Sequence, residues 1–156
     1  MAPINQLGYG IAGLNIFKEL QSITDVCLHV IGNPQVTNKQ DAEMVQAGIE
    51  RARFFDPKGT CIKVWHQNDM TQSVGRGEYI GFPIFELDKF TDLELHHLKS
   101  VDRLFVCSKW AQSVVYEQFK TRDHIYRKNK GVFEEIKSDD VSVIPLGVDT
   151  NIFKPM

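Results

Sequence analysis

Residues 141–155 read Val-Ser-Val-Ile-Pro-Leu-Gly-Val-Asp-Thr-Asn-Ile-Phe-Lys-Pro, a stretch that indicates the fold class. The first four form a short apolar run typical of a buried strand, after which Pro145 and Gly147 turn the chain into a polar loop. Ligands of α/β proteins bind at the carboxyl ends of parallel strands. We therefore expect Gly147 and Asp149 beside a cleft, where glycine permits close approach and aspartate offers a carboxylate. The alternative is a connector that only leaves the sheet.

Length and composition indicate one ordinary globular domain. The chain has 156 residues, of which 42% are hydrophobic and 24% charged. Its 18 basic and 20 acidic side chains leave a net charge of -2, so no overall field would attract nucleic acid. No apolar run approaches the roughly 18 to 20 residues needed to span a bilayer, and the N-terminus lacks the pattern of a signal peptide. We expect a cytoplasmic protein.

The cysteines are an odd number without paired spacing. Cys27, Cys61 and Cys107 each lie in a strand-like apolar run, and no Cys-x-x-Cys motif is present. We predict buried, reduced thiols rather than metal ligands or redox groups.

Strand-like and helix-like runs alternate along the chain. Apolar runs typical of strands occupy residues 2–6, 25–32, 61–65, 79–85, 100–107 and 141–144. Helical spacing follows Gly13 and spans residues 38–53, and capping signals predict helices after Thr91 and Ser108. This alternation predicts an α/β fold with a doubly wound, mainly parallel, Rossmann-like sheet. Gly81 and Pro83 predict an irregular or edge strand at 79–85, and residues 121–140 are expected to be a surface excursion.

Three glycines precede the first helical pattern. Gly8, Gly10 and Gly13 predict a glycine-rich turn between a strand and a helix, where backbone N–H groups can face a phosphate or a sugar hydroxyl. Their spacing also matches the dinucleotide fingerprint, which requires an acidic residue about 20 positions further on, at the end of the second strand. Asp25 lies at the start of that strand instead. An NAD-dependent oxidoreductase is therefore the weaker interpretation, and we expect no binding in a fluorescence titration with NADH.

Polar residues follow the predicted strand at 61–65. His66, Gln67, Asn68 and Asp69 offer consecutive hydrogen-bonding groups at a strand's carboxyl end, a pattern suited to sugar hydroxyls. The alternative is a solvated loop. Glu86 and Asp88 follow the next strand and are candidate carboxylates for binding an acceptor. Ser108 is a helix cap or, alternatively, a ligand contact.

Two segments carry a family resemblance. Val-Ile-Pro-Leu-Gly-Val-Asp-x-x-x-Phe-x-Pro at residues 143–155, with Asp102, Ser108 and Trp110 in an Asp-x-x-x-x-x-Ser-x-aromatic element, resembles the N-terminal half of retaining GT-B-fold glycosyltransferases of the family 4 type. The resemblance implies a Rossmann-like N-terminal domain at residues 1–145. Residues 146–156 would then be a closing loop that leads toward a C-terminal donor-binding domain, which the 156 residues do not include.

The resemblance also implies chemistry. It implies sugar transfer from a UDP- or GDP-sugar to an unknown acceptor, with His66 as the catalytic residue. Gly8, Gly10 and Gly13 would approach the donor phosphates or the acceptor, without a metal or a tightly bound cofactor. We expect little or no activity from this chain alone, and a separate donor-binding chain or self-association could complete it. The alternative from another class is a stand-alone Rossmann-type module that binds a sugar or nucleotide or docks a partner.

Overall fold

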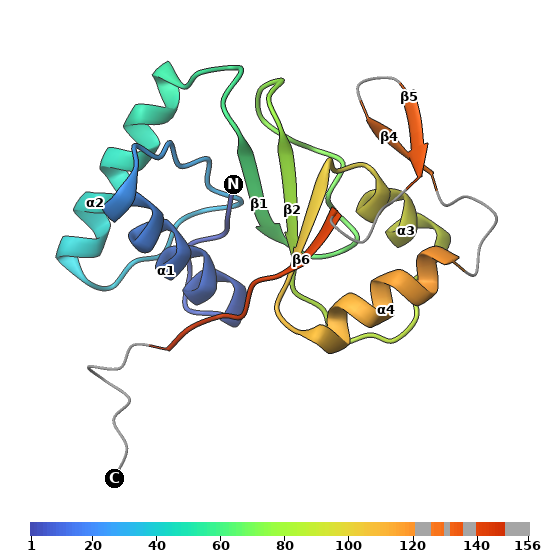
Figure 1. The fold of residues 1–156 in the computed structure, drawn as a ribbon. Helices are drawn as coiled ribbons and strands as arrows, with labels where there is room; N and C mark the ends of the chain where they lie inside the picture. The colour runs from blue at the N-terminus through green and yellow to red at the C-terminus, as the bar shows by residue number, and fades with distance from the viewer. Residues whose placement is uncertain (121–125, 130–131, 136–139, 149–156) are drawn as a thin grey trace, which may run out of the picture.

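A computed structural model describes residues 1–120, 126–129, 132–135 and 140–148, with only the backbone of 126–129 and 132–135 (Figure 1). The elements in chain order are α1 (Gly8–Ile23), α2 (Lys39–Arg51), the short 3₁₀ helix η1 (Ala52–Phe54), β1 (Cys61–Trp65), β2 (Tyr79–Pro83), α3 (Asp92–Lys99), β3 (Arg103–Val106), α4 (Lys109–Lys120), β4 (Tyr126–Asn129), β5 (Val132–Glu135) and β6 (Val141–Val143).

The central sheet is parallel throughout. Its strand order is β1-β2-β3-β6, and its register pairs Lys63 with Gly81 and Leu104 with Val141. Helix α3 connects β2 to β3 and α4 precedes β6, whereas a loop without a helix connects β1 to β2, and helices cover both faces of the sheet. The sequence-based prediction of an α/β, Rossmann-like fold is confirmed. Strands β4 and β5 form a separate antiparallel pair within the predicted surface excursion, much of which lies outside the described residues.

The two predicted N-terminal strands are not formed as regular strands. One parallel bridge joins Ala2 to Val30, and the nitrogen and oxygen of Met1 bond to Ile62 and Val64 of β1 at 2.5 and 2.9 Å. Pro3 has no N–H to donate, which interrupts any ladder through this segment. Residues 1–4 nevertheless lie between β1 and residues 29–31. The sheet thus continues beyond β1 as two irregular extended segments.

Strand β2 lies in the middle of the sheet, so the prediction of an edge or irregular strand is wrong. All five of its residues are buried. Pairing with β3 ends at Gly81, whereas pairing with β1 continues to Pro83. Because the Ile84 nitrogen bonds toward β1, the nitrogen of Pro83 points to the β3 side, beyond the end of that ladder. The proline therefore removes no hydrogen bond from the sheet.

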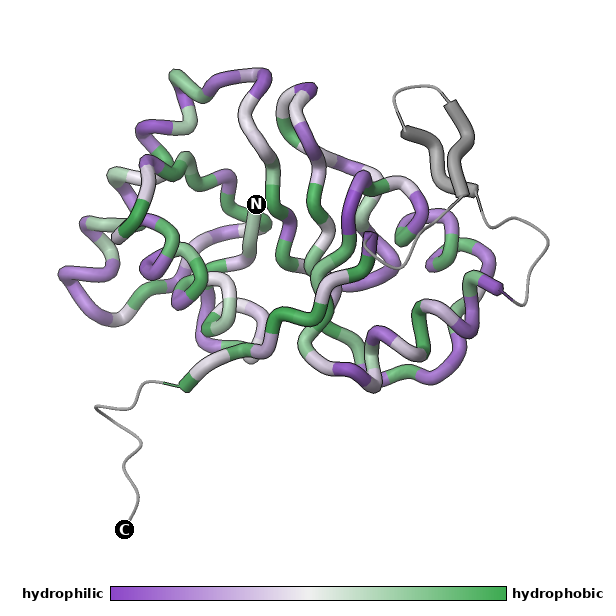
Figure 2. The backbone as a smooth tube through the Cα atoms, in the orientation of Figure 1, coloured by the Kyte–Doolittle hydropathy of each residue, from purple (hydrophilic) through white to green (hydrophobic). Residues whose placement is uncertain are grey.

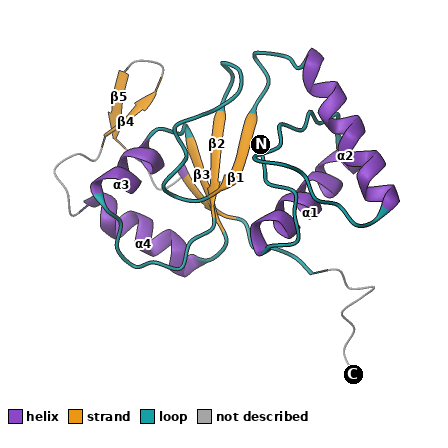
Figure 3. Ribbon diagram, turned by 180° about the vertical axis from the view of Figure 1, so that it is seen from behind, coloured by secondary structure: helices purple, strands orange, loops and turns teal. Residues whose placement is uncertain are grey.

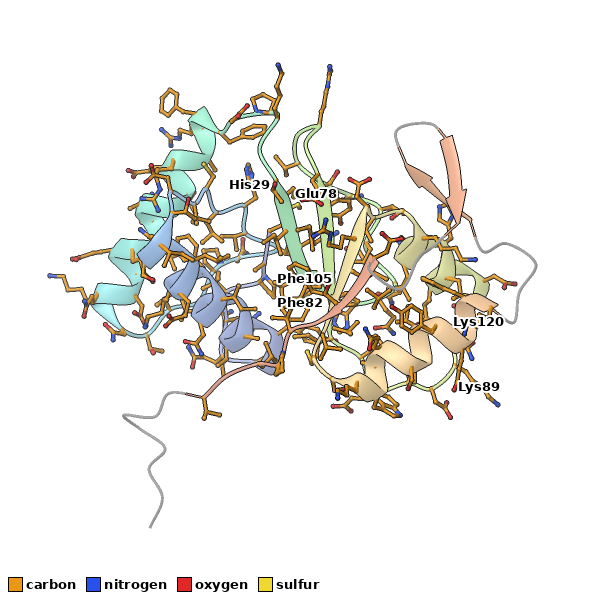
Figure 4. The ribbon with its side chains drawn as sticks, viewed as in Figure 1. His29, Glu78, Phe82, Lys89, Phe105 and Lys120 are labelled. Carbon is orange, nitrogen blue, oxygen red and sulfur yellow. The ribbon has the colours of Figure 1, made fainter. Side chains whose placement is uncertain are left out.

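Each face of the sheet packs against its own pair of helices. Figure 3 shows α1 and α2 on one side of the sheet and α3 and α4 on the other. Val64 and Phe82 face α1, and Phe82 meets Phe105 edge to face at 6.1 Å in the middle of the molecule (Figure 4). Leu104 and Val106 pack with α3 and α4 on the opposite face. Alternate residues of one strand serve the two cores, as the pleat requires.

The helix starts follow local signals in the sequence. Asn38 caps α2 by accepting a bond from the Gln40 nitrogen at 2.8 Å. Thr91 and Glu94 form the predicted capping box of α3. Helix α2 ends at Arg51, where η1 replaces the last turn of the predicted helix. Capping residues fixed these boundaries because their hydrogen bonds are made within three residues.

Candidate functional site

The connections of the sheet reverse between residues 1–4 and β1. After Ile4 the chain enters α1 on one face, whereas after Trp65 it enters the loop that leads to Met70 on the other face. The crevice outside such a switch point is where open α/β sheets bind ligands. Tyr9 on α1 and His66 after β1 lie at this point. The candidate site is therefore located by topology, before any side-chain chemistry is considered.

Three aromatic rings meet at the switch point. The ring centroid of Tyr9 lies 4.2 Å from that of His66 and 5.7 Å from that of Trp65, and Trp65 lies 4.7 Å from His66. The Tyr9 hydroxyl donates a hydrogen bond to the carbonyl of Ile84, just after β2. This bond ties the start of α1 to the end of β2, and the ring contacts tie it to the end of β1. Sequence reasoning missed Tyr9, although its position between Gly8 and Gly10 was a signal.

The electrostatic surroundings of Tyr9 include a second strand end. Burial raises the pKa of the Tyr9 hydroxyl, and the nearby Glu86 carboxylate and Cys107 thiol raise it further. Glu86 is exposed after β2, and Cys107 follows β3, so both belong to the carboxyl edge of the sheet. Tyr9 therefore remains a neutral hydroxyl at physiological pH. It can donate one hydrogen bond and accept others.

His66 is placed where the sequence predicted it. It directly follows β1, is half-buried, and its carbonyl accepts a bond from the Asp69 nitrogen at 3.2 Å, which closes a tight turn. Its ring is oriented by the Tyr9 and Trp65 rings rather than by a carboxylate partner among the described residues. An imidazole so held can exchange hydrogen bonds with a ligand in the crevice.

Gln67 and Asp69 bind protein groups rather than lying free in the crevice. The buried Gln67 amide donates to Glu94 of α3 at 2.8 Å, and Asp69 pairs with the Lys63 ammonium at 3.4 Å. The Lys63 side chain is only 2% exposed, and sequence reasoning did not single it out. Burial by itself raises the pKa of Glu94, but bonds from Thr91 and Gln67 outweigh it and hold that pKa below its usual range.

The predicted glycine-rich turn is instead the first part of α1. Gly8 is the first residue of the helix and a Cβ there would meet open space, whereas Gly10 and Gly13 are buried. A Cβ on Gly10 would collide with Asn5, and one on Gly13 with the Pro3 carbonyl. The prediction of a turn is wrong, since all three glycines are helical and residues 1–5 pack directly against this part of α1. Gly10 and Gly13 permit that close approach.

The start of α1 has no side-chain cap. Its N-cap is Leu7, whose side chain has no acceptor, and its first turn contains no acidic residue. The first N–H groups of a helix have no intrahelical partner and carry partial positive charge. This end of α1 is therefore suited to an anion.

The other predicted site residues are spread along the carboxyl edge. Asp88 is exposed, and Ser108 caps α4 by accepting a bond from the Ala111 nitrogen at 3.1 Å. Gly147 is exposed, and Asp149 lies outside the described residues. Three of the predicted residues are related to Tyr9. The His66 ring contacts the Tyr9 ring, the Glu86 charge acts on the Tyr9 hydroxyl, and Gly8 precedes Tyr9 in the chain. The capping hydrogen bond accounts for a serine at position 108 without any contact to a ligand.

A separate cavity lies away from the switch point. It measures about 410 Å³ and is lined by α1, residues 24–29 and residues 55–62. These segments lie at the amino ends of the strands, where His29 and Glu78 are also seen (Figure 4). Its walls are mainly apolar, which gives few groups to orient a polar ligand. The switch point offers donors, an imidazole and a hydroxyl together, and we therefore place the candidate site there.

Several further features bear on cofactors and partners. The three cysteines are free thiols, half-buried rather than fully buried as predicted, and burial raises the pKa of Cys107. Within the described residues, no group of three or more His, Cys, Asp or Glu side chains is placed to hold a metal ion. No helix in the described part of the chain is both long and apolar enough to cross a bilayer.

Comparison with known proteins yields no match. No family profile, no curated protein and no solved structure is similar to this chain.

Proposed function

We propose that this chain is the acceptor-side domain of a retaining glycosyltransferase that uses a UDP- or GDP-sugar. The observation that supports it is the meeting of the α1 N-terminus, Tyr9 and His66 at the switch point of a parallel sheet. The sequence resemblance to the N-terminal half of GT-B enzymes supplies the reaction class. The topology of the sheet supports placing the site at the switch point.

The chemistry follows from these groups. In such a transfer the bond between the sugar and the nucleotide diphosphate breaks, and negative charge grows on the departing phosphate. The N–H groups at the start of α1 would stabilise that charge, because they are fixed in direction before the reaction begins. His66 and the exposed Glu86 would hydrogen-bond the sugars and hold them in place. Catalysis would rest on positioning and charge stabilisation, without a metal.

Calorimetric titration tests the proposal. The purified chain is titrated with UDP, GDP and their common sugar conjugates, and the titration is repeated with His66→Ala. His96→Ala is the matched control, since His96 is exposed on α3. We expect one nucleotide to be preferred, with weaker binding after His66→Ala alone. Equal loss in both variants, or none in either, would remove His66 from the site.

Activity assays give the second test. We expect no sugar transfer by the 156-residue chain in isolation, because a GT-B enzyme grips the nucleotide mainly through its other half. Turnover by this chain would contradict that expectation. Absence of nucleotide binding by the folded chain would assign the donor site to another domain and leave this one with the acceptor alone.

An exposed apolar strip favours a second candidate, a partner-docking module. Leu7 and Val148 are 72% and 70% exposed, and Ile11, Ile144 and Leu146 are 49%, 42% and 43% exposed. Figure 2 shows hydrophobic residues alternating with paler ones along the segment after β6, where Ile144, Leu146 and Val148 alternate with proline and glycine. Apolar groups gathered in this way mark contact surfaces. Leu146→Asp should abolish self-association in sedimentation if a second copy covers the strip.

A further inference from the structure

The loop at residues 66–71 is fastened to α3 by two side chains of that helix. Gln67 donates to Glu94 at 2.8 Å. The backbone nitrogens of Met70 and Thr71 both donate to Nδ1 of His97, at 3.1 and 3.2 Å. Because His97 receives two bonds on one atom, it fixes two consecutive peptide groups at once. Two of the three hydrogen bonds that join the loop to α3 are therefore accepted by a single imidazole nitrogen.

The bonds determine the state of the His97 ring. A nitrogen that accepts hydrogen bonds carries no proton, so Nδ1 is bare and the ring is neutral with its hydrogen on Nε2. An asparagine side chain places its Oδ1 on the same γ carbon as Nδ1 and can accept the same bonds. Leucine fills similar space and can accept none. This chemistry gives a matched pair of substitutions.

The fastened peptide groups lie directly beyond His66. The His66 carbonyl accepts a bond from Asp69, so the turn that begins at His66 ends one residue before Met70. The Tyr79 hydroxyl also donates to the carbonyl of Met70, at 2.5 Å, from β2. The turn is therefore held at its far end by α3 and β2, while its near end continues β1. Movement of Met70 would be passed to His66 through a three-residue turn.

We propose that His97 is a positioning residue of the switch-point site. Its neutral imidazole holds the 66–71 loop so that the His66 ring stays against Tyr9, 4.2 Å between centroids. Its importance for binding rests on the proposed function of His66. The positioning itself does not, because it concerns the geometry of the free chain.

The test compares His97→Leu, His97→Asn and the wild-type chain by NMR. In wild type, long-range proton–nitrogen spectra should show His97 protonated on Nε2. In His97→Leu, exchange of the Met70 amide and of the Thr71 amide should each accelerate about fivefold, the factor that corresponds to a lost hydrogen bond of about 1 kcal/mol. The proton contacts between His66 and Tyr9 should weaken in the same variant. His97→Asn should restore both properties.

His96→Leu is the control, because His96 is exposed on the same helix with its ring centroid 6.0 Å from that of His97. It should leave the exchange rates and the His66 contacts unchanged. A folded His97→Leu chain with intact His66–Tyr9 contacts would overturn the proposal and leave His97 a merely structural residue. So would protonation of His97 on Nδ1, or failure of asparagine to restore the contacts.

If His97→Leu does not fold, the wild-type tautomer and the His97→Asn contacts decide the question by the same criteria. Nucleotide titration separates the two proposals. Loss of nucleotide affinity in His97→Leu, with recovery in His97→Asn, would link positioning to binding. A wild-type chain that binds no nucleotide, but shows the expected tautomer and exchange rates, would refute nucleotide binding and leave the positioning role intact.

Discussion

Asp69→Asn tests whether the buried charge of Lys63 needs its partner. The Lys63 side chain is 2% exposed, Asp69 is 44% exposed, and their charged atoms are 3.4 Å apart. At that separation the attraction is about 1 kcal/mol in bulk water and about 5 kcal/mol at the effective dielectric of 20 that suits protein sites. Because water reaches Asp69 but not Lys63, we expect an intermediate loss. We predict that Asp69→Asn lowers the free energy of unfolding by about 2 to 3 kcal/mol.

Lys63→Met should behave differently. Methionine keeps the long apolar stem of lysine and removes the charge that folding must desolvate, while Asp69 stays partly hydrated. The free energy of unfolding should therefore change by less than about 1 kcal/mol. In the Lys63→Met background, Asp69→Asn should cost less than about 0.5 kcal/mol, since no cation is left to lose its partner.

Urea denaturation of the four chains gives the coupling energy directly, provided that unfolding is two-state. The exposed pair of Lys39 and Glu43, 91% and 69% exposed at 3.8 Å, supplies the control. Glu43→Gln should cost no more than about 0.5 kcal/mol. Equal and additive losses from Asp69→Asn and Lys63→Met would refute the reasoning, because the cost would then come from packing and not from an unpaired buried charge.

Three further predictions use the same measurements. Gly13→Ala should lower the free energy of unfolding by about 1 to 3 kcal/mol, because the new Cβ meets a backbone carbonyl. Gly8→Ala places its Cβ in open space and should change that free energy by less than about 0.5 kcal/mol. Similar effects of the two substitutions would contradict the packing role of Gly13. Tyr9→Phe removes the donor to the carbonyl after β2 and should cost about 1 kcal/mol; unchanged stability would argue against that bond. Burial raises the pKa of Glu94, but hydrogen bonds hold that pKa below its usual value near 4.5. The contribution of Glu94 to the stability of the fold is therefore present above that pH and is lost as pH falls. A Glu94→Gln chain should show a flatter fall of Tm in acid, and an identical profile would contradict this sign.

Helix boundaries were predictable because their signals are local. Asn38, Thr91 and Ser108 each accept a bond from a backbone nitrogen two or three residues ahead, so the sequence order already contains the contact. The apolar runs of β1, β3 and β6 were equally clear. Short-range chemistry therefore predicted most of the helices and the class of the fold.

Strand position in the sheet was not predictable in the same way. Pro83 argued for an edge, yet its missing N–H matters only on the side where a neighbour pairs, and that depends on where β3 stops. Pro3 had the opposite effect, because it left a well-placed segment without a continuous ladder. The same residue type was neutral in one strand and disruptive in another, and register decided which.

Part of the candidate site was predictable from strand ends. His66 follows an apolar run and therefore lies at the carboxyl edge. The partners of Gln67 and of Met70 lie 27 positions away on α3, and no spacing rule links them. Lys63 was overlooked because a lysine within a strand reads as solvent-facing until its carboxylate partner is located. Sequence therefore found the residue at the crevice and missed those that hold its loop.

The glycines connect the fold to the site in a way that their motif did not suggest. Read as a phosphate loop, Gly10 and Gly13 would act on a ligand, but each instead faces the N-terminal segment where a Cβ would collide. Without those side chains α1 lies directly on residues 3–5, and that depth brings Tyr9, one residue before Gly10, against His66. A bulkier residue at either position would lift the helix and part the two rings. Gly8, by contrast, is exposed at the first position of α1 and meets nothing, so of the three glycines it alone leaves the helix start open.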